Sequence, residues 1–327
     1  MRRVVLFILL LSICNAVPAQ VKWQQVDSFY QPLPSSVHVY FTDTPLDTSP
    51  FRAYYLVADL KDKRLKFTAD TTSGRRLTPS NFFEKNNQPL VVVNCTFFSF
   101  ETNRNLNAVI KEGKLVSYNV HSLPGRGKDT FTYRHPFGSA LGITRKRKAD
   151  IAWLFTDSLR GIAYARQGPV PFTKDSLSGF TKEEATKAVL KAIPPDKKVK
   201  LSFSRWKMQT AVGGGPVLLQ HGEITITNNE ELKFTGKAIE DKHPRTAMGY
   251  TPDGKLIILV IEGRNKKAGG ATLTQEAQLF KDLGCTEALN LDGGGSSCLL
   301  INGKETIRVS DAAGQRPVPA VFLISRK

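Results

Sequence analysis

The sequence is poor in cysteine and histidine, with four cysteines and five histidines in 327 residues. So few cysteines do not form a disulfide framework, although a single bridge stays open. The histidines show no His-x-His pair and no His/Asp cluster with the spacing of metal ligands, and they stand at His38, His121, His135, His221 and His243. We therefore expect no required cofactor, while a structural metal held by carboxylates or backbone oxygens stays open.

No apolar run is long enough to form a stable anchor in a bilayer. The longest candidate, residues 4–13, follows the basic start Met1-Arg2-Arg3 and precedes Val17-Pro18-Ala19. This pattern predicts a signal peptide over residues 1–19, cleaved after Ala19, and a protein exported to the periplasm or secreted, without a transmembrane segment. Anchoring as a lipoprotein through Cys14 is the weaker alternative, because Ile13 stands where that signal requires a small residue.

Acidic residues are fewer than basic ones, but the basic residues are not concentrated in one segment of the sequence. The formal net charge is +17, and loss of Arg2 and Arg3 with the leader would leave +15. No block of five consecutive basic residues occurs, and the densest patch, residues 145–148, lies in a predicted turn without interleaved aromatics. This distribution favours a solvated loop over a nucleic-acid site, and the overall positive field of an exported protein suits an anionic substrate or envelope surface more than nucleic acid.

The chain has neither internal repeats nor low-complexity tracts, and its pattern is mostly that of short strands. Four turn glycines between β-rich runs predict hairpins at Glu112-Gly113, His221-Gly222, Asp253-Gly254 and Asn302-Gly303. We predict an α+β fold: a single compact domain with a mixed or antiparallel β-sheet core, several hairpins and a few short helices.

Three helices can be recognised from their capping residues. The first begins at Thr78-Pro79, where a cap precedes a first-turn proline. The second runs from Thr181, with Glu184 closing a capping box, to a stop at Pro194-Pro195. The third begins near Thr272 and ends at Gly284.

The predicted domain organisation is simple. Residues 20–80 form an N-terminal extension and first strands packed on the main domain, and residues 81–327 form that domain. The helical and polar stretch 165–204 lies between β-rich halves and is predicted to be an insertion or lid.

The most informative segment is Leu-Asn-Leu-Asp-Gly-Gly-Gly-Ser-Ser, residues 289–297. A buried strand here delivers Asp292 to a turn of Gly293, Gly294 and Gly295, followed by Ser296. Because glycine lacks Cβ, such a turn bends sharply or approaches a ligand closely. A tight hairpin with a solvated aspartate is the structural alternative.

Three further polar clusters follow apolar runs. Asn94 and Thr96 follow one of them, beside two aromatic residues, and a buried amide must find partners. The run Gly213–Gly215 can form an anion-binding nest, although no Gly-Lys-Ser/Thr follows it as in a phosphate loop. The third cluster pairs Arg245-Thr246 with Glu262-Gly263-Arg264 across a predicted hairpin, and arginine suits phosphate or carboxylate oxygens.

The ordered series of these motifs resembles the phosphodiester glycosidase family over residues 90–320. Three positions depart from the family pattern: Cys95 replaces a usual glycine, Glu262 a usual aspartate, and Lys267-Ala268 stand where a serine or arginine is frequent. The motifs that carry the resemblance are Asn94-Cys95-Thr96-Phe97-Phe98, Gly213-Gly214-Gly215-Pro216, Arg245-Thr246-Ala247-Met248-Gly249, Glu262-Gly263-Arg264, Gly270-Ala271-Thr272-Leu273, Leu291-Asp292-Gly293-Gly294-Gly295-Ser296-Ser297 and Arg316-Pro317-Val318-Pro319.

The resemblance implies hydrolysis of a sugar-1-phosphodiester, typically an α-N-acetylglucosamine 1-phosphate linkage. Asp292 and Glu262 are then the predicted catalytic carboxylates, and Arg245 and Arg264 the predicted phosphate clamp. The other predicted substrate- or phosphate-binding residues are Asn94, Thr96, Thr246, Gly213, Gly214, Gly215, Gly293, Gly294, Gly295, Ser296, Thr272 and Arg316. Two alternatives stay open at this point: a binding module that holds a phosphorylated glycan without cutting it, and a phosphodiesterase that cleaves P–O instead of C–O.

Overall fold

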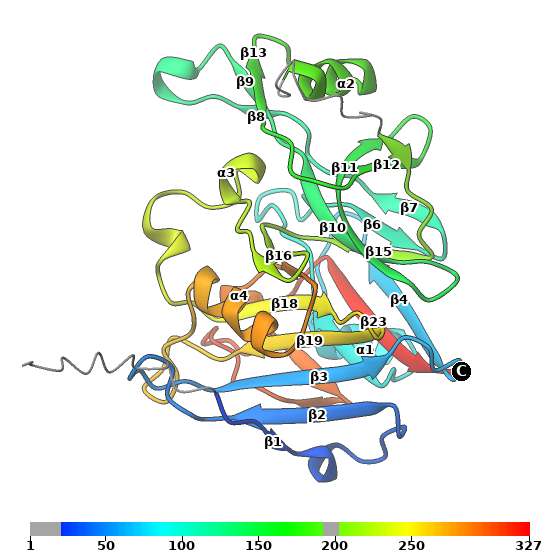
Figure 1. Cartoon of the computed structure of the whole chain (residues 1–327), viewed down its shortest axis with the longest axis vertical. Helices are drawn as coiled ribbons and strands as arrows, with labels where there is room; N and C mark the ends of the chain where they lie inside the picture. Colours follow the sequence, from blue (N-terminus) through cyan, green and yellow to red (C-terminus); the bar gives the residue numbers. More distant parts are fainter. Residues whose placement is uncertain (1–20, 192–202) are drawn as a thin grey trace, which may run out of the picture.

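The computed structural model describes residues 21–191 and 203–327, so the predicted signal peptide and the Pro194-Pro195 helix stop lie outside the described residues. The chain forms four antiparallel sheets with short helices on their outer faces (Figure 1). All paired strands of the described residues run antiparallel, which settles the predicted choice between a mixed and an antiparallel core.

An eight-stranded sheet forms the lower layer in Figure 1. Its strands, in spatial order, are β1 (Gln24–Gln25), β2 (Val37–Thr42), β3 (Ala53–Asp59), β19 (Lys255–Ile261), β18 (Arg245–Tyr250), β20 (Glu287–Asn290), β16 (Val217–Gln220) and β17 (Glu223–Ile224). A five-stranded sheet packs beside it, in the order β22 (Lys304–Glu305), β21 (Leu299–Ile301), β5 (Val91–Asn94), β23 (Ala320–Arg326) and β4 (Leu65–Thr71).

Two further sheets form the upper part of the molecule in Figure 1. The seven-stranded sheet consists of β14 (Ser204–Arg205), β12 (Ile162–Arg166), β11 (Ala149–Asp157), β10 (Gly138–Ile143), β15 (Thr210–Gly213), β6 (Val109–Lys111) and β7 (Lys114–Ser117). The three-stranded sheet consists of β13 (Thr173–Asp175), β9 (Tyr133–His135) and β8 (Leu123–Pro124). The predicted insertion, 165–204, supplies β13 and helix α2 (Lys182–Lys191) to this part.

The predicted helix starts are confirmed, because each rests on a local hydrogen bond. Helix α1 (Pro79–Lys85) is capped by Thr78, whose side chain accepts from the Asn81 N–H. Helix α2 has the Thr181–Glu184 capping box in both directions, and helix α4 (Leu273–Asp282) has one between Thr272 and Gln275. A fourth, short helix, α3 (Asn228–Glu231), was not predicted.

The four predicted hairpin turns are also confirmed. Both central residues have positive φ at Glu112-Gly113, His221-Gly222 and Asn302-Gly303. Such turns match the right-handed twist of the flanking strands, which is why a glycine in second place marks them in the sequence. The β18–β19 connection is longer, and its Gly254 has a φ of 91°.

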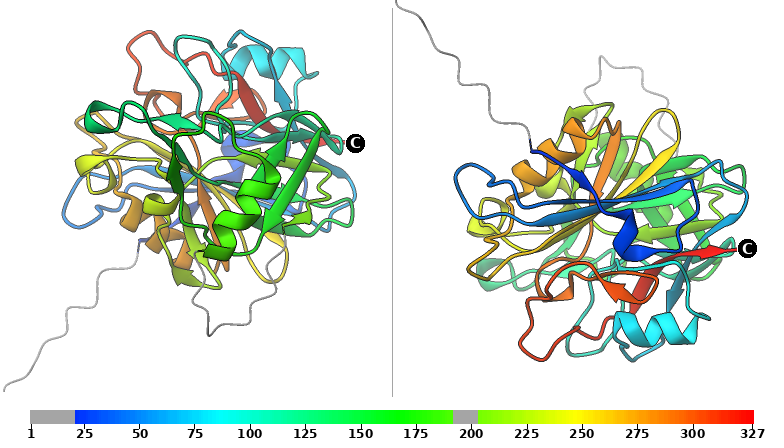
Figure 2. Two further views of the ribbon diagram at one scale, coloured as in Figure 1. Left: turned by 90° about the horizontal axis from the view of Figure 1, so that it is seen from above. Right: turned by 90° about the horizontal axis from the view of Figure 1, so that it is seen from below.

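The main core lies between the inner faces of the three large sheets. Its largest fully buried side chains are Trp153 of the seven-stranded sheet, Phe322 of the five-stranded sheet and Phe137 of the loop before β10. The outer faces have covers of their own: Phe280 of α4 packs on the eight-stranded sheet, and Phe82 of α1 packs on the five-stranded sheet. Figure 2 shows α1 on the outside of that sheet.

The described part of the predicted extension, residues 21–80, contributes strands to the large sheets and does not form an appended layer. Strand β3 is an interior strand, paired with β2 on one side and β19 on the other. Strand β4 pairs along its whole length with β23, near the other end of the chain. The chain therefore has no structural boundary at residue 80.

One buried carboxylate joins the seven-stranded sheet to strand β16. Glu231, which is 2% exposed, accepts hydrogen bonds from the Ser139 N–H and hydroxyl at 3.1 and 2.7 Å and from Trp153 Nε1 at 3.2 Å. It also accepts from the Val217 N–H at 3.1 Å and the Thr227 hydroxyl at 2.7 Å. Five donors satisfy the charge that burial would otherwise make costly.

We predict that Glu231→Ala lowers the free energy of unfolding by about 3–5 kcal/mol, because five buried donors lose their acceptor. Urea denaturation measures this directly. Glu230→Ala, one residue away and at a partly exposed position, should change the free energy of unfolding by less than about 0.5 kcal/mol. Equal effects of the two substitutions would contradict the role assigned to Glu231.

Candidate active site

Four strand ends with polar residues meet at one edge of the two central sheets. In the eight-stranded sheet, Arg245 at the start of β18 is paired with Ile261 at the end of β19, and Ala247 is paired with Asn290 at the end of β20. In the five-stranded sheet, Asn94 at the end of β5 lies opposite Val321. The sequence predicted these strand ends separately, and the sheet order brings them together.

The glycine turn after β20 is fixed to both sheets by its backbone. The Asp292 N–H donates to the Cys95 carbonyl at 2.8 Å, and the Gly294 N–H donates to the Pro244 carbonyl at 2.8 Å. Gly294 has a φ of 61° and opens a short 3₁₀ turn, Gly294–Ser296. A Cβ on Gly293 would lie 2.8 Å from the Pro244 carbonyl oxygen, so this turn requires glycine for its close approach to β18.

The Asn94 amide connects the turn to the strands around it. Its Nδ2 donates to the Asp292 carbonyl at 2.5 Å, and its Oδ1 accepts from the Thr246 hydroxyl at 3.0 Å and the Cys298 N–H at 3.1 Å. Asn94 and Thr246 are both fully buried. Their observed partners make them positioning residues for the Asp292 turn, whereas the sequence predicted that they contact substrate.

Asp292 is a carboxyl group in a poorly solvated position. Burial raises its pKa to about 7, although a hydrogen bond from Ser296, the charge of Arg316 and the Gly293 N–H all act to lower it. Its Oδ2 is buried and has no hydrogen-bond partner within the described chain. The residue as a whole retains partial exposure. A carboxyl group of this kind exchanges a proton near neutral pH and still faces an approaching ligand.

Two arginines lie against the glycines of the turn. Arg316 forms a two-point ion pair with Asp311 at 2.7 and 2.8 Å, and its Nη1 is 3.5 Å from the Ser296 hydroxyl. A Cβ on Gly295 would lie 2.1 Å from Arg316 Nη2, so the guanidinium is packed on the bare glycine backbone. On the neighbouring glycine, a Cβ at Gly294 would lie 3.1 Å from Arg264 Nη2.

Arg264 is exposed and forms no ion pair with any described residue. Its backbone has a φ of 62°, and its Nη2 is 3.5 Å from Nδ1 of His243. Desolvation, together with the charges of Arg245 and Arg264, lowers the pKa of His243. An uncommitted guanidinium beside a neutral imidazole can bind an anionic oxygen.

Arg245 is the buried arginine of the site, with 2% exposure. Its Nε donates to the Ala271 carbonyl at 2.9 Å and its Nη2 to the Asp241 carbonyl at 3.1 Å. Glu276 lies nearby with both oxygens buried and without hydrogen bonds, and burial raises its pKa to about 8. These two hydrogen bonds use two of the five N–H donors of Arg245, and its burial limits the access of a substrate to the others.

Glu262, the second predicted carboxylate, is 4% exposed and has partners on both oxygens. Oε1 accepts from Asn265 Nδ2 at 3.0 Å, and Oε2 accepts from the Arg308 N–H at 3.2 Å. Arg52 Nε is 3.6 Å from Oε2. Asn265 follows Arg264 directly in the chain, so this carboxylate fixes the loop that carries Arg264.

The other predicted glycine run is built differently. The N–H groups of Gly213, Gly214 and Gly215 donate to the carbonyls of Ala108, Ser139 and Asn290, respectively. Neighbouring protein atoms occupy the space that a side chain would need: a Cβ on Gly214 would lie 2.3 Å from the Asn290 carbonyl oxygen. These amides are not free to form an anion nest in this conformation, and we do not retain them in the phosphate site.

Two predicted threonines also have structural partners. The Thr96 hydroxyl donates to Asn105, which in turn donates to the Thr71 hydroxyl at 2.8 Å. The Thr272 side chain caps helix α4. Of the predicted set, the structure gathers Arg264 and Arg316 against the turn formed by Asp292 and Gly293–Ser296. Asn94 and Thr246 are hydrogen-bonded to each other beneath this turn, and Arg245 begins the adjoining strand β18.

Sequence reasoning missed two residues of this site. Asp311 holds Arg316 in place, and His243 lies beside Arg264. Each is a lone residue in a loop, with no spacing to another polar residue that could have marked it. Arg264 and Asp311 both line a cavity of about 410 Å³.

The three described cysteines, Cys95, Cys285 and Cys298, are buried free thiols, so no disulfide forms among them. Burial raises the pKa of Cys95 to about 12. Within residues 21–191 and 203–327, no group of three or more His, Cys, Asp and Glu side chains is arranged to hold a metal ion. No helix of the same residues is long and apolar enough to cross a membrane.

We predict that Asp292→Asn stabilises the fold at high pH. The folded pKa of about 7 lies above the ordinary value of 3.8, so the wild type loses stability as pH rises from about 4 to 7 and the variant does not. Urea denaturation at pH 8 should show a gain of roughly 2–4 kcal/mol, after allowance for partial exposure, and almost none at pH 4. Asp43→Asn, at an exposed position, is the control, and a gain independent of pH would contradict the prediction.

The family model of the phosphodiester glycosidases matches residues 160–325. The prophage-derived uncharacterised protein YomE of Bacillus subtilis is 43% identical over 84 residues, which cover 26% of this chain and 13% of that protein. The N-acetylglucosamine-1-phosphodiester alpha-N-acetylglucosaminidase of Mus musculus is 31% identical over 94 residues, which cover 26% of this chain and 18% of that protein. The matched segments thus span less than a fifth of either relative.

Solved structures share the fold. The catalytic domain of zebrafish N-acetylglucosamine-1-phosphodiester alpha-N-acetylglucosaminidase, auto-inhibited by its pro-peptide, aligns with a TM-score of 0.57 and 20% identity, over 94% of this chain and 89% of that one. A hypothetical protein from Synechocystis aligns with a TM-score of 0.57 and 16% identity, over 89% of this chain and 62% of that one. Together with the family match over half of the chain, these findings show that the protein belongs to the phosphodiester glycosidase family.

Proposed function

We propose that this protein hydrolyses the glycosidic bond of a sugar-1-phosphodiester, with α-N-acetylglucosamine 1-phosphate as the preferred sugar-phosphate unit. The observation that carries the proposal is the turn that follows β20. Asp292 in this turn has a pKa raised to about 7, and the guanidinium groups of Arg264 and Arg316 lie against Gly294 and Gly295 of the same turn. We further propose that the protein acts after export, in the periplasm or as a secreted enzyme, on envelope or host glycans.

The chemistry requires less acid catalysis than ordinary glycoside hydrolysis. Cleavage of the bond between the anomeric carbon and oxygen builds positive charge on the sugar, while the electron pair leaves with the phosphate. A phosphomonoester is a good leaving group, so neutralising its charge contributes more than protonating it. Water then supplies the hydroxyl of the free sugar, and its proton passes to a base.

We assign these tasks to different side chains. Asp292 can take the proton of the attacking water or stabilise the anomeric carbon, since its carboxyl group changes state near neutral pH. Arg264 has no carboxylate partner within the described chain and can turn to the phosphate. Arg316 is held by Asp311 and presents a fixed charge beside Ser296. Glu262 remains the second predicted carboxylate, and its engaged oxygens favour positioning of the Arg264 loop.

Hydrolysis of methyl α-N-acetylglucosaminyl phosphate in ¹⁸O-labelled water tests the reaction. We expect the label in the released sugar, which means C–O cleavage, and a loss of at least a hundredfold in kcat for Asp292→Asn, as for removal of a general base. Label in the phosphate would establish P–O cleavage instead. Recovery of bound, intact substrate after long incubation would identify a binding module.

The phosphate clamp makes a separate prediction. Arg264→Ala should lower kcat/KM for the phosphodiester by roughly ten- to a hundredfold, because a charge-assisted hydrogen bond is worth about 1.5–3 kcal/mol. For an aryl glycoside of the same sugar, which has no phosphate, kcat/KM should fall much less. Arg264→Lys should recover only part of the activity, because a point charge lacks the two-pronged guanidinium geometry.

Lys266→Ala is the matched control for this clamp, since it removes an exposed positive charge from the same loop. The variant should hydrolyse both substrates with kcat/KM values within about twofold of those of the wild type. Equal losses on phosphodiester and aryl glycoside in Arg264→Ala would show that Arg264 supports the loop and does not bind phosphate.

A further inference from the structure

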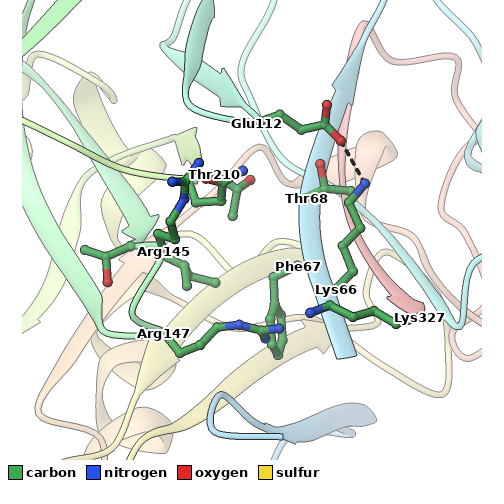
Figure 3. A pocket seen from close by; sticks show the side chains of 11 residues that line it. Lys66, Phe67, Thr68, Glu112, Arg145, Arg147, Thr210 and Lys327 are labelled. Carbon is green, nitrogen blue, oxygen red and sulfur yellow. Dashed lines mark hydrogen bonds and ion pairs between the residues drawn. The ribbon is translucent and has the colours of Figure 1, made fainter. Parts of the chain in front are cut away.

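The densest basic patch of the sequence, Arg145-Lys146-Arg147-Lys148, opens onto a cavity. The patch forms the turn between β10 and β11, and two of its four side chains, those of Arg145 and Arg147, line a pocket of about 270 Å³. The opposite wall comes from β4 and the residue after β23, with Lys66 and Lys327 (Figure 3). Lys146 and Lys148, in the same turn, do not line it.

The charge of this pocket is strongly one-sided. Four basic residues, Lys66, Arg145, Arg147 and Lys327, face a single acidic residue, Glu112, which pairs with Lys66 at 2.7 Å. The other three basic side chains have no ion pair within the described chain. Asp62, outside the pocket lining, also acts on Arg147 through its charge. A concave wall with four basic side chains and one acidic one still concentrates a positive field inside it.

Two buried polar groups that line the pocket have no hydrogen-bond partner. In a turn that is simply solvated, such groups would be exposed to water. The Arg147 guanidinium lies over the Phe67 ring, 5.2 Å from its centre, and its Nη2 donates to the Leu65 carbonyl. Its Nη1 is buried without a partner. The hydroxyl of Thr210, a residue only 1% exposed, is also unpaired. Buried groups of this kind normally find an acceptor or donor, and a bound oxyanion supplies several acceptors.

The pocket continues into a second one of about 510 Å³, with which it shares Glu112, Arg145 and Gln209. Arg205 and Lys207 line that second pocket. Ile143 of the first pocket belongs to the inner core and Trp206 of the second to the cluster on the other face of the seven-stranded sheet. The two pockets therefore form a groove that bends around the end of this sheet, with basic side chains in both parts.

This groove is separate from the Asp292 site. The antiparallel pair β4–β23 runs between them: Thr71 faces Ala320 at the active-site end, and Leu65 faces Arg326 at the groove end. Six strand residues at about 3.3 Å each place the two sites roughly 20 Å apart.

We propose that the pocket binds a phosphoryl group and that the groove holds a phosphate-bearing glycan chain away from the active site. Arg147 supplies a fixed donor, Thr210 a hydroxyl, and Arg145, Lys66 and Lys327 the neutralising charge. The proposal goes beyond the catalytic one and shares no residue with it. An accessory site of this kind keeps a polymeric substrate on the protein between successive cleavages.

Isothermal titration of the mature chain with inorganic phosphate, and with a short glycerol-phosphate oligomer, tests the site. The variant Arg145→Gln/Arg147→Gln should weaken binding of both at least tenfold. The control Lys146→Gln/Lys148→Gln removes the same charge from the same turn and should change binding by less than twofold. The oligomer should bind more tightly than phosphate, because it also occupies the second pocket.

If the two double variants lower the affinity for phosphate equally, the proposed site is overturned in favour of general attraction by a basic surface. If neither variant lowers this affinity, the proposed site is overturned as well. Equal affinities for phosphate and oligomer would overturn the groove. If the Arg145/Arg147 variant does not fold, Thr210→Val and the single change Arg145→Gln, compared with Lys146→Gln, provide the same test. Turnover of the small methyl phosphodiester should be the same in all these variants, which separates failure of this proposal from failure of the catalytic one.

Discussion

The whole site depends on one buried amide. Asn94 ends β5 and bonds at once to the Asp292 carbonyl, the Thr246 hydroxyl and the Cys298 N–H, so the two central sheets and the catalytic turn share a single fixed point. Each partner is itself buried or part of the turn, and none can be replaced by water without opening the core. The position of the Asp292 carboxyl group is therefore set by the strand order of the fold.

The two arginines near that carboxyl group differ in how firmly they are held: Arg316 is fixed by an ion pair, and Arg264 is not. Asp311 neutralises and orients Arg316, which can stay beside Asp292 without returning its pKa to the ordinary range. Arg264 has no such partner among the described residues and remains available to an incoming anion.

Local features of the fold could be predicted from the sequence, because they are determined within a few residues: the caps at Thr78, Thr181 and Thr272 and the glycine hairpins are examples. The strand order could not, since the pairing of β3 with β19 joins segments some two hundred residues apart. The two triple-glycine runs show the same limit within the site. They look alike in sequence, yet one packs against strand carbonyls and the other against two guanidinium groups, and only tertiary contacts decide which.

The left-handed backbone of Arg264, with its φ of 62°, has a consequence for evolution and engineering. A residue with a Cβ pays roughly 1–2 kcal/mol for this conformation, which glycine does not. Selection for thermostability alone would thus replace Arg264 by glycine or asparagine. With the phosphate contact proposed above, a stability-guided redesign at position 264 would gain stability at the expense of substrate binding.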